Sequence, residues 1–356
     1  MKQNKTQYIP GELIEIKNNT SSEIYSNDKI LPPNYVIKFL DKSGVASTTE
    51  VYSEGNKYSI GDKVYVKQVQ SPDSSYVILG DKMREPEIYG SIFIFCAVVI
   101  SIFGLKGFRA LFSLTVSFLV IFLVLIPAMA KGYNPVLLSA GIATLLLALS
   151  MFITHGKSKV TYAALLGCSI SIFITVLMSY AIIIYSKLGG YTDAGSYYIE
   201  NGLSGPGSYI NLSFLIIASI IIGVIGAVDD GAITQAKIVE EIKTLNKNIT
   251  NYDCYKRAMN IGRDHGGAMI NTLILAYVAS SIPQLMFLYT SDIPLNILLN
   301  SEVVATEIFR ATISSIGLLL AIPLTTYFAV RFIKAVDLKD RVRDSHVHSH
   351  VSGHSH

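Results

Sequence analysis

The chain has 356 residues, of which 51% are hydrophobic and only 15% are charged, and its mean hydropathy is +0.44. In soluble globular proteins about a quarter of all residues are charged, so the low charged fraction of this chain indicates membrane-embedded segments. The net charge of +3 is small and the basic residues are dispersed, which argues against nucleic-acid binding. The three cysteines predict neither a disulfide nor a thiolate metal site, and we expect no cofactor.

Residues 1–87 have the composition of a small soluble domain. Five short stretches alternate between apolar and polar residues and are separated by turn-forming residues, which predicts a β-barrel-like domain of the OB or SH3 type. The stretches are Glu12–Ile16, Tyr35–Leu40, Ser47–Tyr52, Lys63–Val69 and Tyr76–Leu79. This part of the sequence contains no histidine and no cysteine, so we expect it to contact a partner or act in gating rather than to catalyse a reaction.

From Ile88 onward the chain consists of long apolar runs. Because a hydrocarbon core of about 30 Å requires roughly 17–25 helical residues, residues 88–334 are predicted to form about seven transmembrane helices. The segments are Ile88–Phe103, Ala110–Ala128, Pro135–Phe152, Tyr162–Tyr185, Leu212–Val228, Ala268–Tyr289 and Thr306–Val330. The short connection Gly104–Arg109 predicts a tight helical hairpin, and residues 231–258 read as a cytoplasmic amphipathic connector.

The charges of the connectors predict the orientation. Basic residues such as Lys106, Lys157 and Lys237 are concentrated in every second connector. The segment after the last predicted helix is basic as well. By the positive-inside rule, the C-terminus is cytoplasmic and residues 1–87 lie outside a bacterial cytoplasmic membrane. The first residues contain no hydrophobic stretch that could translocate this domain. We therefore expect a further N-terminal membrane helix in the native protein, with translocation by the first hairpin as the alternative.

The last segment, residues 335–356, holds five of the seven histidines. A tract of this kind can bind Zn²⁺ or Ni²⁺. We nevertheless expect a disordered polar tail, because nothing in the pattern indicates a rigid ligand geometry.

Ionisable residues at the ends of two apolar runs form the candidate site. Charged groups in membrane helices are costly, so a cluster of them indicates a proton or cation site. The candidate residues are Asp229, Asp230, Arg263, Asp264, Asn271 and Thr272. A structural alternative is that Asp230 caps a helix over Ala232–Leu245. We expect Arg263 to pair with Asp229, and a second structural alternative is that this ion pair only orients the two helices.

Five glycines accompany these residues and predict close helix packing, because small residues let helix backbones approach in membranes. They are Gly223, Gly226, Gly262, Gly266 and Gly267.

The runs GAVDDGAITQAKIVEEI and AMNIGRDHGGAMINTLILAYVASSIPQL resemble the YibE/F-like family of bacterial integral membrane proteins. The resemblance extends to YIPGELIEI and YSIGDKVYV near the N-terminus. It implies a polytopic membrane protein but no specific activity. Two features differ from the family pattern: the missing first membrane helix, and a second aspartate, Asp230, where a small apolar residue is expected. An acidic helix end followed by an amphipathic helix is also similar in arrangement to export-driving permeases.

The sequence favours a membrane permease of unknown substrate, coupled to protons or cations through the candidate residues. The alternative is a non-transporting scaffold or assembly factor whose external domain binds a protein partner. We do not expect an enzyme, because the sequence has no His-Glu-x-x-His, no Gly-x-Ser-x-Gly and no P-loop motif. The oligomeric state stays open.

Overall fold

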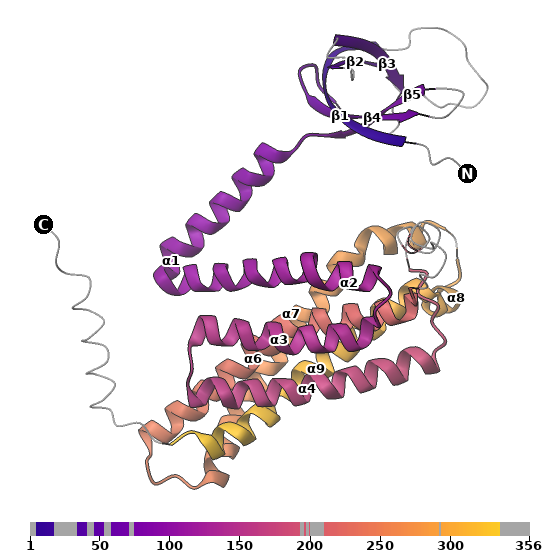
Figure 1. The fold of residues 1–356 in the computed structure, drawn as a ribbon. Helices are drawn as coiled ribbons and strands as arrows, with labels where there is room; N and C mark the ends of the chain where they lie inside the picture. The colour runs from indigo at the N-terminus through magenta and orange to yellow at the C-terminus, as the bar shows by residue number, and fades with distance from the viewer. Residues whose placement is uncertain are drawn as a thin grey trace, which may run out of the picture. The chain divides into compact units, whose positions relative to one another are not determined.

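The computed structural model describes residues 5–17, 34–40, 46–52, 58–70, 75–192, 196, 199, 210–291 and 293–334 (Figure 1). The chain divides into two compact units, Met1–Val98 and Val99–His356, which are treated separately below. The predicted tail at residues 335–356 and most of the connector before Ile210 lie outside the described residues.

The first unit contains a five-stranded antiparallel sheet with strand order β3-β2-β1-β4-β5. Its strands are β1 (Lys5–Lys17), β2 (Asn34–Leu40), β3 (Ala46–Tyr52), β4 (Lys63–Gln70) and β5 (Ser75–Lys82). The first half of β1 pairs with β4 and its second half with β2, with a bulge between Leu13 and Glu15. Leu13, Ile37 and Val66 are fully buried in the core, as the alternating pattern predicts.

The five predicted strands are present, but the sheet is not closed into a barrel. Each strand pairs only with its neighbours in the order above, and no ladder joins β3 to β5 among the strands described. Alternation along a strand defines the buried face but not whether the two edge strands meet, so the expected OB- or SH3-like closure was wrong.

Six helical stretches of the described chain are long and apolar enough to cross a membrane. The first consists of α1 (Glu85–Val120), a π-helical turn η1 (Ile121–Leu125) and α2 (Ile126–Ala130). The others are α3 (Pro135–His155), α4 (Lys159–Tyr185), α6 (Leu212–Leu245), α7 (Asn251–Tyr289) and α9 (Glu302–Phe332), with a short α8 (Leu295–Asn300) before α9.

The first of these six stretches holds the first two predicted segments, because α1 consists of two helices that meet at a break at Gly104. Gly104 has φ 56° and ψ −135°, a conformation that residues with a side chain rarely adopt. A Cβ on Gly107 would lie 2.6 Å from the carbonyl oxygen of Val99, so the turn also excludes a side chain there. The break lies within the short connection that predicted a hairpin.

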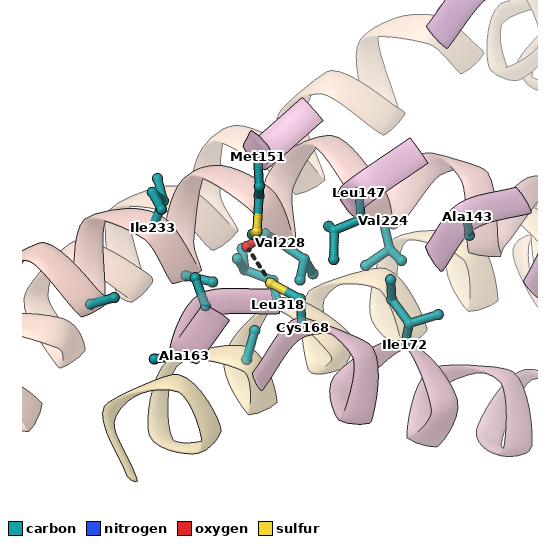
Figure 2. Close-up of a cluster of buried hydrophobic side chains, with 14 of the residues drawn as sticks. Ala143, Leu147, Met151, Ala163, Cys168, Ile172, Val224, Val228, Ile233 and Leu318 are labelled. Atoms are coloured by element: carbon teal, nitrogen blue, oxygen red, sulfur yellow. Dashed lines mark hydrogen bonds between the residues drawn. The ribbon is translucent and has the colours of Figure 1, made fainter. Parts of the chain in front are cut away.

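Helices α4, α6 and α9 pack on one another at the centre of the second unit. Helix α3 packs on α4 and α6, and α7 packs on α6 and α9. Met151, Cys168 and Val228 meet in this core, where the Cys168 thiol donates to the carbonyl oxygen of Val228 at 3.5 Å (Figure 2). Helix α6, which carries the aspartate pair, therefore contacts four of the other long helices.

Small residues bring α4 and α9 close together. A Cβ on Gly167 would lie 2.7 Å from the Cα atom of Thr325, and one on Gly317 would lie 2.5 Å from Oγ1 of Thr175. Ser171 also donates to the carbonyl oxygen of Gly317. Such contacts between helix backbones are typical of membrane helix pairs.

Candidate functional site

The aspartate pair lies inside one continuous helix. Asn211 caps α6 by accepting a hydrogen bond from the Phe214 backbone N–H at 3.2 Å, and the helix then continues to Leu245. Because α6 runs unbroken through Asp230, no helix begins at that residue, and the alternative that Asp230 caps a helix over Ala232–Leu245 was wrong. Gly231 lies within this helix, and its lack of a side chain gives room to Leu318 of α9, whose Cδ1 would lie 3.1 Å from a Cβ there.

Asp229 is half-buried, and its Oδ2 accepts a hydrogen bond of 2.7 Å from the hydroxyl of Ser150 on α3. It lines a cavity of about 370 Å³ between α1, α3 and α6, which we call the Asp229 cavity. The cavity is also lined by polar side chains of α1 and α3, namely Ser113, Ser117, Ser150, Thr154 and His155. At 1.5 Å per residue, Asp229 lies about 26 Å along α6 from Leu212. If α6 enters the hydrocarbon core near Leu212, Asp229 lies near the opposite surface of a core about 30 Å thick.

Asp230 lines the same cavity and also a second hollow of about 670 Å³ between α6 and α7, the Asp230 groove. Thr234, His265 and Thr272 supply the other polar side chains of this groove. Successive helix residues point about 100° apart, which lets the two carboxylates face different sides of α6. The pair therefore connects two hollows on either side of one central helix.

The remaining predicted residues do not join this cluster. Arg263, Asp264 and Asn271 are exposed on α7 and line neither the cavity nor the groove. Within the part of the chain that the structure describes, no ion pair joins Arg263 to Asp229, so the expected pairing is not present. The reason is the orientation of α7, whose buried positions recur every four residues at Cys254, Ala258, Gly262 and Gly266.

The five predicted packing glycines fall into two groups. A Cβ on Gly262 would meet Gln235, one on Gly266 would meet Ile322, and one on Gly223 would meet the Tyr277 hydroxyl, each at 2.6–2.7 Å. By contrast, a Cβ on Gly226 or Gly267 would have no atom within 4 Å. Three of these glycines thus lie at close helix contacts and two face open space.

Sequence reasoning missed two polar features of the bundle. Gln235, only 1% exposed, donates to the carbonyl oxygen of Ala258 at 2.9 Å and to Oγ1 of Thr326 at 2.8 Å, which links α6, α7 and α9. Glu307 and Arg310 form an ion pair of 2.7 Å on α9. Opposite charges three residues apart within an apolar run were the available signal for the second feature.

The model of the YibE/F-like protein family matches residues 91–335. The chain belongs to the YibE/F-like family. The matched range covers most of α1 and every later helix through α9, and it begins after the β-sheet. No curated protein and no solved structure matches this chain. Together with the apolar helices, family membership indicates a membrane protein, and the resemblance seen in the sequence is confirmed over residues 91–335.

Proposed function

We propose that this YibE/F-like protein is a permease of the bacterial cytoplasmic membrane, coupled to protons or another cation through Asp229 and Asp230. The observation that carries the proposal is the position of Asp229: a half-buried carboxylate, inside a membrane-length helix, that lines a hydroxyl-rich cavity. We further propose that the protein is not an enzyme and acts on a solute without converting it.

The cost of the charge supports a functional role. An ionised aspartate at the centre of a membrane helix costs about 2.5–3.5 kcal/mol on insertion scales, and less near the interface. Ser150 supplies one hydrogen bond to Asp229, which leaves the carboxylate with further acceptor capacity. Hard cations and protonated water prefer oxygen ligands, and the hydroxyls of the Asp229 cavity provide them.

The arrangement on both sides of α6 suggests a route. Because Asp230 lines both the Asp229 cavity and the Asp230 groove, a proton or cation held by one carboxylate can pass to the other across the helix. Two neighbouring carboxylates repel each other when both are ionised. The pair therefore tends to hold one proton or cation between its two groups.

The proposed orientation follows from the connectors. Lys106 lies beside the break in α1 at Gly104, Lys157 lies between α3 and α4, and Lys243 and Lys247 lie near the α6–α7 connection; the positive-inside rule predicts that these three places are cytoplasmic. Asp229 then lies in the cytoplasmic half of the membrane, and the β-sheet unit lies outside.

One observation favours a second candidate, a scaffold or assembly factor whose external unit binds a protein partner. The sheet has two edge strands, β3 and β5, which lie close to each other without pairing, and an edge strand can accept a strand from a partner. Under this proposal the charges of α6 only stabilise the bundle.

The test is proton flux into proteoliposomes that contain a pH-sensitive dye, under an imposed potential. Asp229→Asn keeps the size of the side chain and removes its charge. The matched control is Asp264→Asn, the same substitution on a surface of α7 that lines neither hollow. We expect wild-type flux in the control and at least tenfold less in Asp229→Asn.

Equal flux in the wild type and in Asp229→Asn refutes coupling through this carboxylate. Absence of flux in all three proteins, together with stoichiometric co-purification of a partner that depends on residues 1–87, favours the scaffold.

A further inference from the structure

The Asp230 groove changes in character along its length. Helices α6 and α7 follow each other after a short connection and pack on each other, so they run antiparallel. Thr234, Asp230 and His265 line the end of the groove that is nearer to this connection, whereas Leu273 and Ala276 line the other end. The groove therefore has a polar end and an apolar end.

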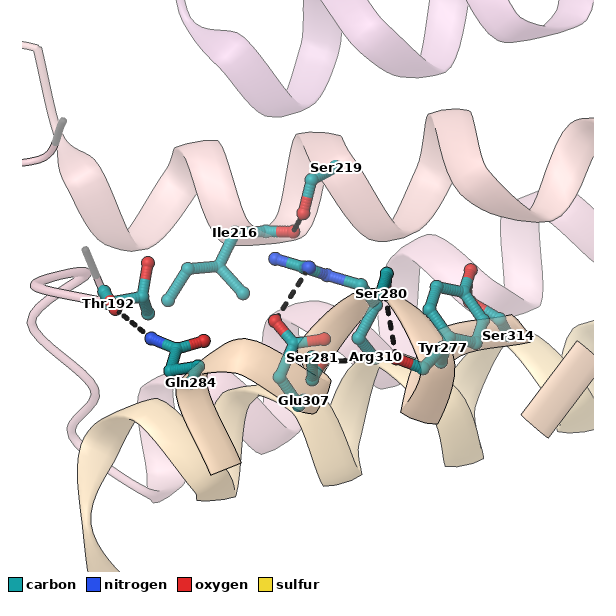
Figure 3. A network of polar contacts seen from close by, with 10 residues as sticks. All are labelled: Thr192, Ile216, Ser219, Tyr277, Ser280, Ser281, Gln284, Glu307, Arg310 and Ser314. Carbon is teal, nitrogen blue, oxygen red and sulfur yellow. Dashed lines mark hydrogen bonds and ion pairs between the residues drawn. The ribbon is translucent and has the colours of Figure 1, made fainter. Parts of the chain in front are cut away.

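The carboxylate at the polar end is not neutralised by the protein. None of the ion pairs in the described part of the chain includes Asp230, and neither a lysine nor an arginine lines the groove. By contrast, Glu307 on α9 is neutralised by Arg310 at 2.7 Å, beside polar side chains of α7 (Figure 3). Asp230 is exposed and lines the groove, so a cation bound there can contact its carboxylate and balance its charge.

The other polar side chains of the groove supply hydrogen-bond acceptors. The Thr272 hydroxyl donates to the carbonyl oxygen of Ala268 at 3.1 Å, and its oxygen can still accept. Thr234 adds a second hydroxyl, and a neutral His265 accepts through one ring nitrogen. An ammonium group carries up to three N–H donors and no acceptor, which matches a carboxylate accompanied by such groups.

The rest of the wall is apolar and includes Ala227, Met269, Leu273 and Ala276. Methionine is flexible, and its sulfur packs favourably against aromatic rings. The groove has a volume of about 670 Å³, within the range of about 300–1,000 Å³ that is usual for small-molecule sites. It therefore has room for an apolar body attached to the charged group.

A metal ion fits the groove less well than an organic cation. Among the residues that the structure describes, no three histidine, cysteine or carboxylate side chains gather as metal ligands. The groove offers one carboxylate and one imidazole, and its aliphatic wall cannot replace the oxygen ligands that a hard cation requires.

We propose that the Asp230 groove binds an amphiphilic organic cation, that is, a protonated amine with an aromatic or aliphatic body. The ammonium group donates to the Asp230 carboxylate at the polar end. The apolar body lies along Met269 and Leu273 toward Ala276. As a substrate site this assignment rests on the proposed permease function, whereas binding itself does not.

The test uses the full chain in lipid nanodiscs and radiolabelled phenethylamine as the probe, measured by scintillation proximity against empty nanodiscs. This amine is protonated at neutral pH. Two competitors each lack one part of it: 2-phenylethanol keeps the ring without the charge, and methylamine keeps the charge without the ring. We expect saturable binding, displaced by unlabelled phenethylamine, with each competitor at least tenfold weaker. This comparison needs no variant and is therefore independent of folding defects.

Variants locate the site. Asp230→Asn keeps the size of the side chain and removes its charge, so we expect phenethylamine binding at least tenfold weaker. The matched control is Asp264→Asn, on a surface of α7 that lines neither hollow, and it should bind within twofold of wild type.

A second pair of variants tests the apolar end. Ala276 and Ala279 are both exposed on α7, but only Ala276 lines the groove. Ala276→Phe places a ring where the body of the ligand lies, so we expect binding at least fivefold weaker. Ala279→Phe adds the same ring outside the groove and should leave binding within twofold of wild type.

Absence of saturable phenethylamine binding to the wild type overturns the proposal. Displacement by 2-phenylethanol as effective as by phenethylamine also overturns it, because it indicates an apolar surface without a role for the charge. Unchanged binding in both Asp230→Asn and Ala276→Phe overturns the assignment to the groove. Phenethylamine binding without proton flux contradicts the permease and leaves the binding site supported, whereas proton flux without phenethylamine binding overturns the site and leaves the permease supported.

Discussion

Gly262→Ala tests the packing of α7 against α6 and α9. The added methyl group would lie 2.7 Å from Oε1 and 2.9 Å from Nε2 of Gln235, and 2.9 Å from Cγ2 of Ile322. The Gln235 side chain would have to shift to make room for this methyl group. Its amide, however, donates two buried hydrogen bonds, to the carbonyl oxygen of Ala258 and to Oγ1 of Thr326. The substitution therefore strains the contact and disturbs the link between three helices.

The expected magnitude follows from three contributions. Overpacking a tight contact costs about 1–3 kcal/mol, and each disturbed hydrogen bond costs about 0.5–1.5 kcal/mol. Replacing glycine by alanine inside a helix returns about 1 kcal/mol. With the central values of these ranges and one or both hydrogen bonds disturbed, we expect Gly262→Ala to destabilise the protein by about 2–3 kcal/mol.

Gly267→Ala is the matched control on the same helix, because a Cβ there has no atom within 4 Å. Only the helix propensity changes, so we expect this variant to be more stable than wild type by up to about 1 kcal/mol. At about 2–4 °C per kcal/mol, the two variants should differ in Tm by roughly 5–15 °C.

A thiol-reactive fluorescent dye measures the unfolding of the protein in detergent. Cys168 and Cys254 are both 0% exposed and react only when the bundle opens. A Tm of Gly262→Ala equal to or above that of Gly267→Ala would refute the reasoning, since the α6–α7–α9 contact would then not be as tight as described.

Three further predictions concern other parts of the chain. Gly104→Ala should destabilise the protein by about 1–3 kcal/mol, because φ 56° with ψ −135° at the turn in α1 is strained for a residue with a Cβ. The same dye assay measures this effect, and an unchanged Tm contradicts it. Gly167→Ala should be among the most destabilising glycine substitutions, because the added methyl group meets backbone atoms of Thr325, which cannot rotate away; folded protein with a wild-type Tm would argue against that contact. In the β-sheet unit, the side chain of Lys82 and the Ser59 backbone N–H donate to Asp62 and hold the pKa of its carboxyl below its usual value of 3.8. The resulting stability is present above pH 3.8 and is lost as the pH falls through the lower folded-state pKa, so Asp62→Asn should lower the calorimetric Tm of this unit at pH 7 but not well below pH 3.8.

Local patterns predicted the elements well. Alternation located the five strands, because the side chains of a strand point to opposite faces in turn. Apolar runs located the membrane-length helices, because a bilayer sets both their length and their composition. The glycine-containing connection before Arg109 predicted a turn that the structure places at Gly104.

The helix boundaries around the aspartate pair were harder to predict. Hydrophobicity ends at Val228, which suggested that the helix ends there as well, yet α6 continues to Leu245. Backbone hydrogen bonds continue through polar residues as readily as through apolar ones, so a change in polarity marks where the environment changes and not where a helix stops.

Composition and periodicity by themselves determined that the chain has a β-rich N-terminal part, a part made of apolar helices of membrane-spanning length, and an aspartate pair at the end of one apolar run. Only the tertiary structure decided which charged residues meet. Arg263 lies on the exposed side of α7, the Asp229 carboxylate accepts a hydrogen bond from Ser150 of α3, and Glu307 forms an ion pair with Arg310 on α9. These contacts depend on how each helix is rotated about its axis, and that rotation is set by small residues on several helices packing at once.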